Sequence, residues 1–449
     1  MREQIKEQLK GKRILFATVP VEGHLNPLTG LAKFLQGQGC DVRWYTSGIF
    51  AKKLEKLGIY HYPYTRAVDI NQTNIGEALP DRVAIQDATA KIEYDLIHFF
   101  GNRAEEYYQD IQALYGFFPF DLMIADCAFS AIPFVRWKMN LPVVSIGIIP
   151  LAEDSVDLAP YGMALPPATT NAERSEYAEL RHLAADVLFK RSIDNFDAIL
   201  NKHGIPHKNS MLFDLLIRAA DMCFQIGVPS FEYKRSDPGE NIRFIGALFP
   251  FTAPGQDLPW YDERLKKYDK IVLVTQGTIE KNSQKLLIPT LEAFKDSDVL
   301  VIATTGHNQT AELRIKYPFA NIIIEDYIPF EEVMRYAHVY VTNGGYGGTL
   351  LSIKHQLPIV AAGVHEGKNE VCARIGYFKI GIDLKTEVPS PAAIRDAVNK
   401  ILIDSSYKNN ITKLSDEING YNGNELSAGH IAELLTNYFL FSRNTWNDC

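Results

Sequence analysis

The chain has 449 residues, of which 46% are hydrophobic and 22% charged, and its formal net charge at pH 7 is −8. A chain of this length is expected to form two domains, because single hydrophobic cores stop growing at about 250–300 residues. The composition is that of a globular protein, and the negative charge without any basic cluster argues against a nucleic-acid partner.

The first predicted elements form a β-α-β unit. The apolar run 13–19 is typical of a strand buried on both faces of a parallel sheet. Asn26 is a good N-cap and Pro27 suits the first helical position, so a helix is predicted to begin there. A strand over 41–46 completes the unit, which is typical of a doubly wound fold. His24 therefore lies at the carboxyl edge of the sheet, where such folds bind ligands, unless it is an ordinary loop histidine.

A second polar residue is predicted at the same edge. The apolar strand 121–125 ends at Asp126, which would lie on the rim that carries His24. A histidine and a carboxylate on one rim are what a general base and its orienting partner need. Two alternatives stay open: Asp126 as the cap of the helix predicted over 130–139, and Asp121, at the other end of the strand, as the relevant carboxylate.

The middle of the chain separates two halves. The polar, proline-broken region 153–211 is predicted to be helical, and insertions of this kind often line a variable substrate pocket. A strand over 221–226 follows, and the next residues are rich in Pro, Gly and aromatics without clear periodicity. We therefore expect an N-terminal domain over 1–228, a linker over 229–268, a C-terminal domain over 269–425, and a helix over 426–449 that packs back on the N-terminal domain.

Alternation of strands and helices restarts in the second half. The strand 270–275 ends in Gln276-Gly277-Thr278, and a helix is predicted over 282–294. Further strands are predicted over 299–304, 321–324, 338–341 and 358–362. The fold class expected is α/β, with two doubly wound Rossmann-like domains facing each other across a cleft.

The stretch Thr342 to Thr349 reads TNGGYGGT and lies between an apolar strand and a helix-compatible run. Glycine lets backbone N–H groups approach an anion, and a helix N-terminus adds partial positive charge. This pattern indicates a phosphate site, and a tight turn that simply starts a helix is the alternative.

Together, the segment 23–28 (GHLNPL), Asp126, the Gln276-Gly277-Thr278 turn and the glycine loop resemble the GT-B glycosyltransferases of family 1. The resemblance is strongest to the bacterial branch that glycosylates macrolides and other small aglycones, and it covers nearly the whole chain. It implies a UDP- or dTDP-sugar donor, inversion at the anomeric carbon, a small hydroxylated aglycone as acceptor, and neither a metal nor a further cofactor.

The resemblance also implies roles for individual residues. His24 would be the general base, oriented by Asp126. The donor site would comprise Gly277, Thr278, Tyr327, Ile328, Asn343, Gly345, Gly347, Gly348, Thr349, Glu366 and Glu370. Within this site the threonines and glycine amides would hold the diphosphate. Tyr327 would stack on the nucleobase, whose edge the Ile328 backbone would contact. Glu366 would bind sugar hydroxyls, and Glu370 lies near the position that faces the nucleotide.

Three positions depart from the family pattern. Asn343 stands where the family often has His, so a diphosphate contact there would be neutral. Leu351 replaces the Glu that often binds ribose, and Gly367 replaces the Gln that usually follows the acidic residue.

Parts of the same sequence are also compatible with other functions. Gly345-Tyr346-Gly347 partly fits the fingerprint of an NAD-dependent oxidoreductase, but Leu350 stands where its third glycine should be. A sugar-nucleotide epimerase and a non-catalytic nucleotide-sugar-binding protein are further alternatives on this architecture. Asp296-Ser297-Asp298 looks like the DxD metal motif of other glycosyltransferases, but it precedes its strand and is better interpreted as a solvated turn.

The remaining observations bear on location and acceptor. The five cysteines form no CxxC pair, and the polar N-terminus 1–12 is unlike a signal peptide. The longest apolar run, 141–152, contains two prolines and is too short to span a bilayer. A cytoplasmic protein without an integral membrane segment is expected. Five phenylalanines are candidates either for the core or for a pocket that binds a flat lipophilic acceptor: Phe99, Phe100, Phe117, Phe118 and Phe129.

Overall fold

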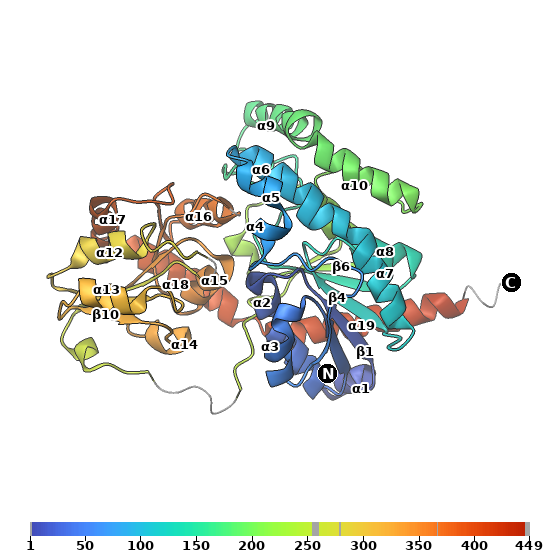
Figure 1. Ribbon diagram of the computed structural model, residues 1–449, viewed down its shortest axis with the longest axis horizontal. Coiled ribbons are helices and arrows are strands. Elements are labelled where there is room, and N and C mark those ends of the chain that lie inside the picture. Colours follow the sequence, from blue (N-terminus) through green and yellow to red (C-terminus); the bar gives the residue numbers. More distant parts are fainter. Residues whose placement is uncertain (1, 254–259, 278–279, 366, 445–449) are drawn as a thin grey trace.

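The structure, a computed structural model, describes residues 2–253, 260–277, 280–365 and 367–444. Two α/β domains lie side by side, and the red helix α19 at the end of the chain extends into the first domain (Figure 1). Every strand pairing within each of the two sheets is parallel. The predicted fold class is confirmed.

The N-terminal sheet has seven strands in the order β3-β2-β1-β4-β5-β6-β7. They are β1 (Arg13–Ala17), β2 (Asp41–Tyr45), β3 (Tyr60–Tyr62), β4 (Leu122–Asp126), β5 (Val143–Gly147), β6 (Met222–Gln225) and β7 (Ile242–Phe244). The helices are α1 (Arg2–Leu9), α2 (Glu22–Gly37), α3 (Ala51–Lys56), α4 (Ile75–Ala78), α5 (Pro80–Ala84), α6 (Ala88–Asp95), α7 (Ala104–Tyr115), α8 (Ile132–Lys138), α9 (Asn171–Leu183), α10 (Lys190–Lys202) and α11 (Leu212–Ala219). Strands β4 and β5 are buried along their whole length, as their continuous apolar sequences predict.

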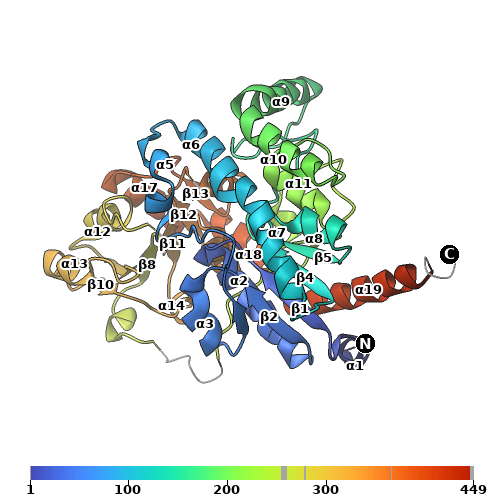
Figure 2. The ribbon, with the colours of Figure 1, turned by 45° about the vertical axis from the view of Figure 1, so that its right-hand side comes forward.

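The C-terminal sheet has six strands in the order β10-β9-β8-β11-β12-β13. They are β8 (Lys270–Thr275), β9 (Val299–Thr304), β10 (Ile322–Glu325), β11 (Val339–Thr342), β12 (Ile359–Ala361) and β13 (Gly381–Asp383). The helices are α12 (Leu287–Phe294), α13 (Thr310–Lys316), α14 (Phe330–Val333), α15 (Tyr346–Lys354), α16 (Lys368–Tyr377), α17 (Pro391–Ile403), α18 (Ser405–Asn419) and α19 (Gly423–Asn444). Helix α19 contacts α1 and α2 of the N-terminal domain, so the end of the chain packs back on the first domain (Figure 2).

The linker predicted over 229–268 is wrong at its start. Strand β7 lies inside that range and pairs with β6, so the N-terminal domain extends at least to Phe244. A strand of three residues with one arginine at its centre is too short to show an alternating pattern, so its periodicity does not reveal it.

Two predicted helices also begin elsewhere. Helix α2 begins at Glu22, so Asn26 and Pro27 lie inside it. The amide of Glu22 donates to Gln72 Oε1 at 2.8 Å, and this non-local bond overrides the local capping preference. Residues 153–170 are irregular rather than helical, and regular helix resumes only with α9. None of the helices in the described part of the chain combines the length and hydropathy of a transmembrane span.

Candidate active site

The structure brings His24 and Asp126 together. His24 lies in the first turn of α2, the helix that follows β1. Asp126 is the last residue of β4, the strand directly beside β1 in the sheet. His24 Nδ1 and Asp126 Oδ1 are 2.8 Å apart, with the carboxylate fully buried and the imidazole 19% exposed. Asp126 also accepts hydrogen bonds from the amides of Val19 at 2.8 Å and Ala128 at 2.9 Å. The carboxylate is therefore fixed, and it holds the proton of a neutral imidazole on Nδ1, which leaves the Nε2 lone pair free.

The two alternatives for this rim can now be compared with the structure. Asp121 accepts a hydrogen bond from the Arg13 amide at 2.8 Å, at the opposite end of β4, and is not the carboxylate near His24. Asp126 does bond a local amide, that of Ala128, but α8 begins only at Ile132 and has no side-chain cap. Asp126 thus orders its own loop and the histidine at the same time.

The glycine loop leads from β11 into α15, as predicted. Gly344 has a φ of +81°, and a Cβ there would lie only 2.5 Å from Cys372 Sγ, so no other residue fits without a shift. A Cβ on Gly348 would lie 3.1 Å from the Tyr340 hydroxyl, against the sheet. A Cβ on Gly347 would meet nothing within 4 Å. The first turn of α15 thus presents its Gly347 side to open space, where free helix amides can bind an anion.

A matched pair of substitutions tests this assignment. Gly347→Ala is expected to leave the free energy of unfolding unchanged or slightly higher, because the position is helical and open, but to weaken UDP binding because the methyl group projects above the loop. Gly344→Ala is expected to lower the free energy of unfolding by about 1–3 kcal/mol, through the positive φ and the clash with Cys372. Urea unfolding and UDP titration measure both effects, and wild-type UDP affinity in Gly347→Ala would contradict the phosphate assignment.

The side chains of two residues expected to touch the diphosphate form hydrogen bonds within the protein. Asn343 Nδ2 donates to the Gln276 carbonyl at 2.5 Å, across the turn in which Gly277 has a φ of +78°. Thr349 is fully buried, and its hydroxyl donates to the Gly345 carbonyl at 3.0 Å, one helical turn earlier. The role of Thr349 at the phosphate stays a prediction, and its hydroxyl is used within α15. Both side chains hold the two turns in shape, and Gly345 forms the N-cap of α15.

The two residues expected at the nucleobase differ in the exposure of their side chains. Tyr327 follows β10 at the same rim and is 73% exposed, whereas the side chain of Ile328 is completely buried. The ring of Tyr327 is thus free to stack, and Ile328 can offer only its backbone. Thr278 and Glu366 lie outside the described residues.

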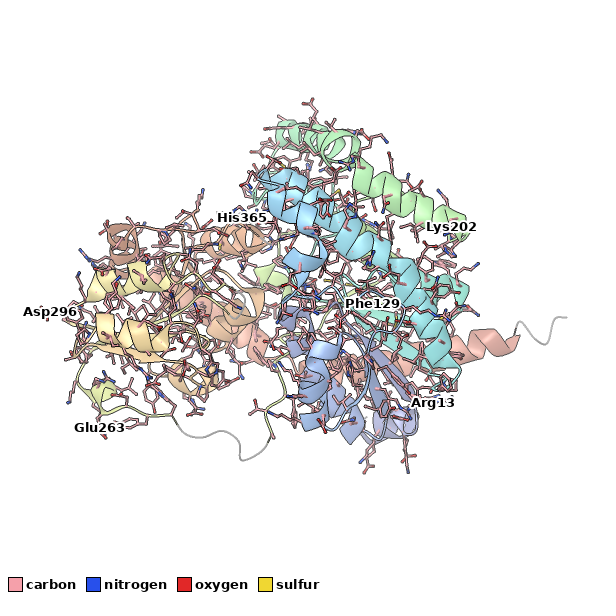
Figure 3. The ribbon with its side chains drawn as sticks, viewed as in Figure 1. Arg13, Phe129, Lys202, Glu263, Asp296 and His365 are labelled. Atoms are coloured by element: carbon pink, nitrogen blue, oxygen red, sulfur yellow. The ribbon has the colours of Figure 1, made fainter. Side chains whose placement is uncertain are left out.

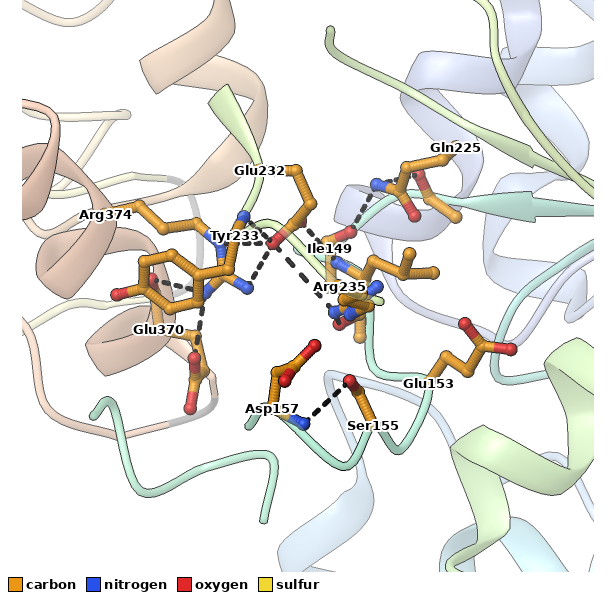
Figure 4. Close-up of polar contacts among 12 residues, drawn as sticks. Ile149, Glu153, Ser155, Asp157, Gln225, Glu232, Tyr233, Arg235, Glu370 and Arg374 are labelled. Atoms are coloured by element: carbon orange, nitrogen blue, oxygen red, sulfur yellow. Dashed lines mark hydrogen bonds and ion pairs between the residues drawn. The ribbon is translucent and has the colours of Figure 1, made fainter. Parts of the chain in front are cut away.

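Glu370, expected near the position that faces the nucleotide, has both carboxylate oxygens bonded within the protein. It is 5% exposed and accepts hydrogen bonds from the amides of Gly162 at 2.7 Å and Ala164 at 2.8 Å. Its second oxygen pairs with Arg374 Nη1 at 2.8 Å. Arg374 in turn pairs with Glu232 at 2.6 Å (Figure 4). A buried carboxylate needs such partners, and the spacing of Glu370 and Arg374 by four helical positions was the sequence signal for this pairing.

The Asp296-Ser297-Asp298 turn lies far from these rims. Asp296 is at the outer edge of the C-terminal domain, whereas His365 is on the side toward the N-terminal domain (Figure 3). Asp298 is exposed and pairs with Lys270 Nζ at 2.8 Å, as expected of a solvated turn.

The two rims face each other. The hydroxyl of Tyr346, in the glycine loop, donates to the Ile226 carbonyl at 3.0 Å, and Ile226 directly follows β6. Since all strands of the N-terminal sheet are parallel, the carboxyl end of β6 lies on the same edge as those of β1 and β4. The glycine loop therefore contacts the edge of the N-terminal sheet on which the His24–Asp126 pair lies.

Comparisons with known proteins agree with this geometry. The family model for UDP-glucoronosyl and UDP-glucosyl transferase matches residues 311–418. The chain is 33% identical to 4'-demethylrebeccamycin synthase of Lentzea aerocolonigenes over 91% of this chain and 96% of that protein. It is 29% identical to UDP-glycosyltransferase 2 of Phaeomoniella chlamydospora over 94% and 95% of the two chains.

Solved glycosyltransferases share the fold. The glycotransferase of kitacinnamycin superposes with a TM-score of 0.74 at 20% identity, covering 95% of this chain and all of that one. VinC, solved in complex with dTDP, gives a TM-score of 0.66 at 17% identity, with 95% and 100% coverage. Fold and site together define a GT-B glycosyltransferase that uses a nucleotide sugar. The chain belongs to the family of UDP-glucoronosyl and UDP-glucosyl transferases. The oxidoreductase and epimerase alternatives gain no support from these relatives.

Proposed function

We propose that the protein transfers a sugar from a UDP- or dTDP-sugar to a hydroxyl of a small lipophilic acceptor, with inversion at the anomeric carbon. The observation that carries the proposal is the 2.8 Å bond between His24 and the buried Asp126 at the carboxyl edge of the N-terminal sheet. A hydroxyl is a weak nucleophile at neutral pH, and an imidazole with a free Nε2 is suited to take its proton as it attacks. The adjacent carboxylate stabilises the imidazolium that forms.

Inversion follows from a single displacement. The acceptor oxygen bonds to the anomeric carbon as the bond from that carbon to the diphosphate oxygen breaks on the opposite face. The acceptor proton passes to His24, and the bonding electrons leave with the diphosphate. The glycine-loop amides and the N-terminus of α15 supply fixed partial positive charge where that negative charge develops.

A lipophilic acceptor is supported by the surroundings of His24. Val21, three residues before it, packs against a small apolar cluster of Ile70, Leu79 and Phe99, which Phe100 also contacts. Phe118 and Phe129 are core residues, and Phe117 is exposed, so these three do not contribute to a pocket. A cytoplasmic location remains a prediction.

The proposal is tested by calorimetric titration of the purified protein with UDP, dTDP, GDP and NAD. Binding of UDP or dTDP without a response to NAD is expected, and it selects the donor for an acceptor screen. The anomeric configuration of the product, read by NMR, then tests inversion. Tight NAD binding with no response to the diphosphates, or retention at the anomeric carbon, would overturn the proposal.

Tyr327→Ala tests the nucleobase assignment. The variant is expected to weaken UDP and uridine binding by the same factor, because stacking of one base on an aromatic side chain is worth about 1–3 kcal/mol. Stability should change little, since the ring is 73% exposed. Tyr60→Ala, at an exposed tyrosine of the N-terminal domain, is the control. A loss confined to UDP would place Tyr327 at the phosphates instead.

A further inference from the structure

A cation beside the glycine loop would add to the partial charge of its amides, and the described side chains expected at the diphosphate carry no positive charge. Asn343 is neutral and its amide is bonded to the Gln276 carbonyl, and the Thr349 hydroxyl is buried against Gly345. Backbone amides provide only partial charge, whereas a full positive charge strengthens a hydrogen bond to phosphate about twofold. The search for a cation beside the glycine loop assumes the proposed function, in which this loop binds the diphosphate of the donor.

Lys368 has the required position. It is the first residue of α16 and follows Gly367, whose φ is +74°. A Cβ added to Gly363 would lie 3.1 Å from the Lys368 Cβ, and one added to Gly344 would lie 3.7 Å from it. The Cβ of Lys368 therefore lies beside the chain where β11 and β12 end, next to the glycine loop, and the residue is half-buried there.

One carboxylate beside the glycine loop, Glu280, interacts electrostatically with Lys368. Burial of Glu280 opposes its ionisation, but bonds to Lys285 and the Asn282 amide, with the charges of Lys285 and Lys368, lower its pKa. Glu280 belongs to the segment that follows β8, on the other side of the glycine loop from α16. Lys285 pairs with Glu280 at 2.5 Å, so the charge of this carboxylate is compensated by Lys285.

We propose that Lys368 is the cation that binds the diphosphate of the donor and stabilises it as it leaves. The ammonium group donates a hydrogen bond to the phosphate oxygen that takes up the bonding electrons when the bond to the anomeric carbon breaks. Lys368 keeps its proton throughout, while the proton of the acceptor goes to His24. In this chain a lysine from α16 thus supplies the charge that Asn343 lacks.

Two substitutions and a graded set of ligands test the proposal. Lys368→Met removes the charge and keeps most of the stem, Lys368→Arg keeps the charge, and Lys354→Met is the control, since Lys354 pairs with Glu331 at the far end of α15. Titrations use UDP, UMP and uridine, or the thymidine series if the wild type prefers dTDP. Lys368→Met is expected to weaken UDP binding about 10- to 100-fold, the worth of a hydrogen bond to a charged group, and to lower kcat.

The expected pattern is specific to charge. Uridine affinity should be unchanged in Lys368→Met, the salt dependence of UDP binding should become shallower, and Lys368→Arg should retain most of the UDP affinity. Equal losses of affinity for UDP and uridine in Lys368→Met, or wild-type UDP affinity in that variant, would overturn the role of Lys368. Either result would leave the proposed function standing. A wild-type protein that binds neither UDP nor dTDP would instead overturn the proposed function.

Discussion

Replacing His24 with alanine is expected to lower kcat by about 10²- to 10⁴-fold, the usual contribution of general base catalysis. Nucleotide affinity should not change, because His24 belongs to the N-terminal rim and the glycine loop to the other domain. The measurement is steady-state turnover with a hydroxyl acceptor, together with UDP or dTDP titration of the same preparation.

A control separates the loss of the base from a general effect of removing a histidine. His182, on α9, is exposed and far from Asp126 in the chain, and His182→Ala should turn over like the wild type. Near-normal turnover in His24→Ala would remove His24 from the reaction. A loss of nucleotide binding equal to the loss of turnover would show that the variant disturbs the whole site.

Arg374→Met is expected to lower the free energy of unfolding by about 3–5 kcal/mol, as is typical when one partner of a buried ion pair is removed. The arginine is almost completely buried and bonds to Glu232 and Glu370, which are buried as well. Without it, two carboxylates remain with only backbone amides and the more distant Arg235, whose Nη2 is 4.0 Å from Glu232. Urea unfolding measures the change.

An exposed pair provides the comparison. Arg335 bonds to Glu332 at 2.7 Å with 57% of its side chain exposed, and Arg335→Met should cost at most about 1 kcal/mol. The triple variant Arg374→Met, Glu232→Gln, Glu370→Gln should recover part of the loss, because it removes the unpaired charges. Equal effects of Arg374→Met and Arg335→Met would show that the buried network contributes little to stability.

Features that depend on local sequence were predictable. Apolar runs identified the strands, and glycine placement identified the loop before α15. The meeting of His24 with Asp126 followed from a topological rule, since neighbouring parallel strands end at one edge. None of these inferences needed knowledge of distant contacts.

Features that distant contacts decide were not predicted. Helix α2 begins four residues before Asn26 because Gln72 and Asp126 hold the preceding backbone. Glu370 turns inward because Gly162, Ala164 and Arg374 surround it in the folded chain. The role proposed for Lys368 could not be predicted from the sequence. A single lysine at the start of a helix indicates no binding site until the fold places it beside the glycine loop.

The buried network also limits how this enzyme can be recombined with its relatives. A crossover placed between the two sheets would take Glu232 and Arg235 from one parent, and Glu370 and Arg374 from the other. Unless both parents carry the same charges, such a chimera inherits an unmatched ion at the domain boundary (Figure 4). A domain taken from a relative can therefore be exchanged only together with both halves of this ion network, so that Glu232 and Arg374 come from the same parent.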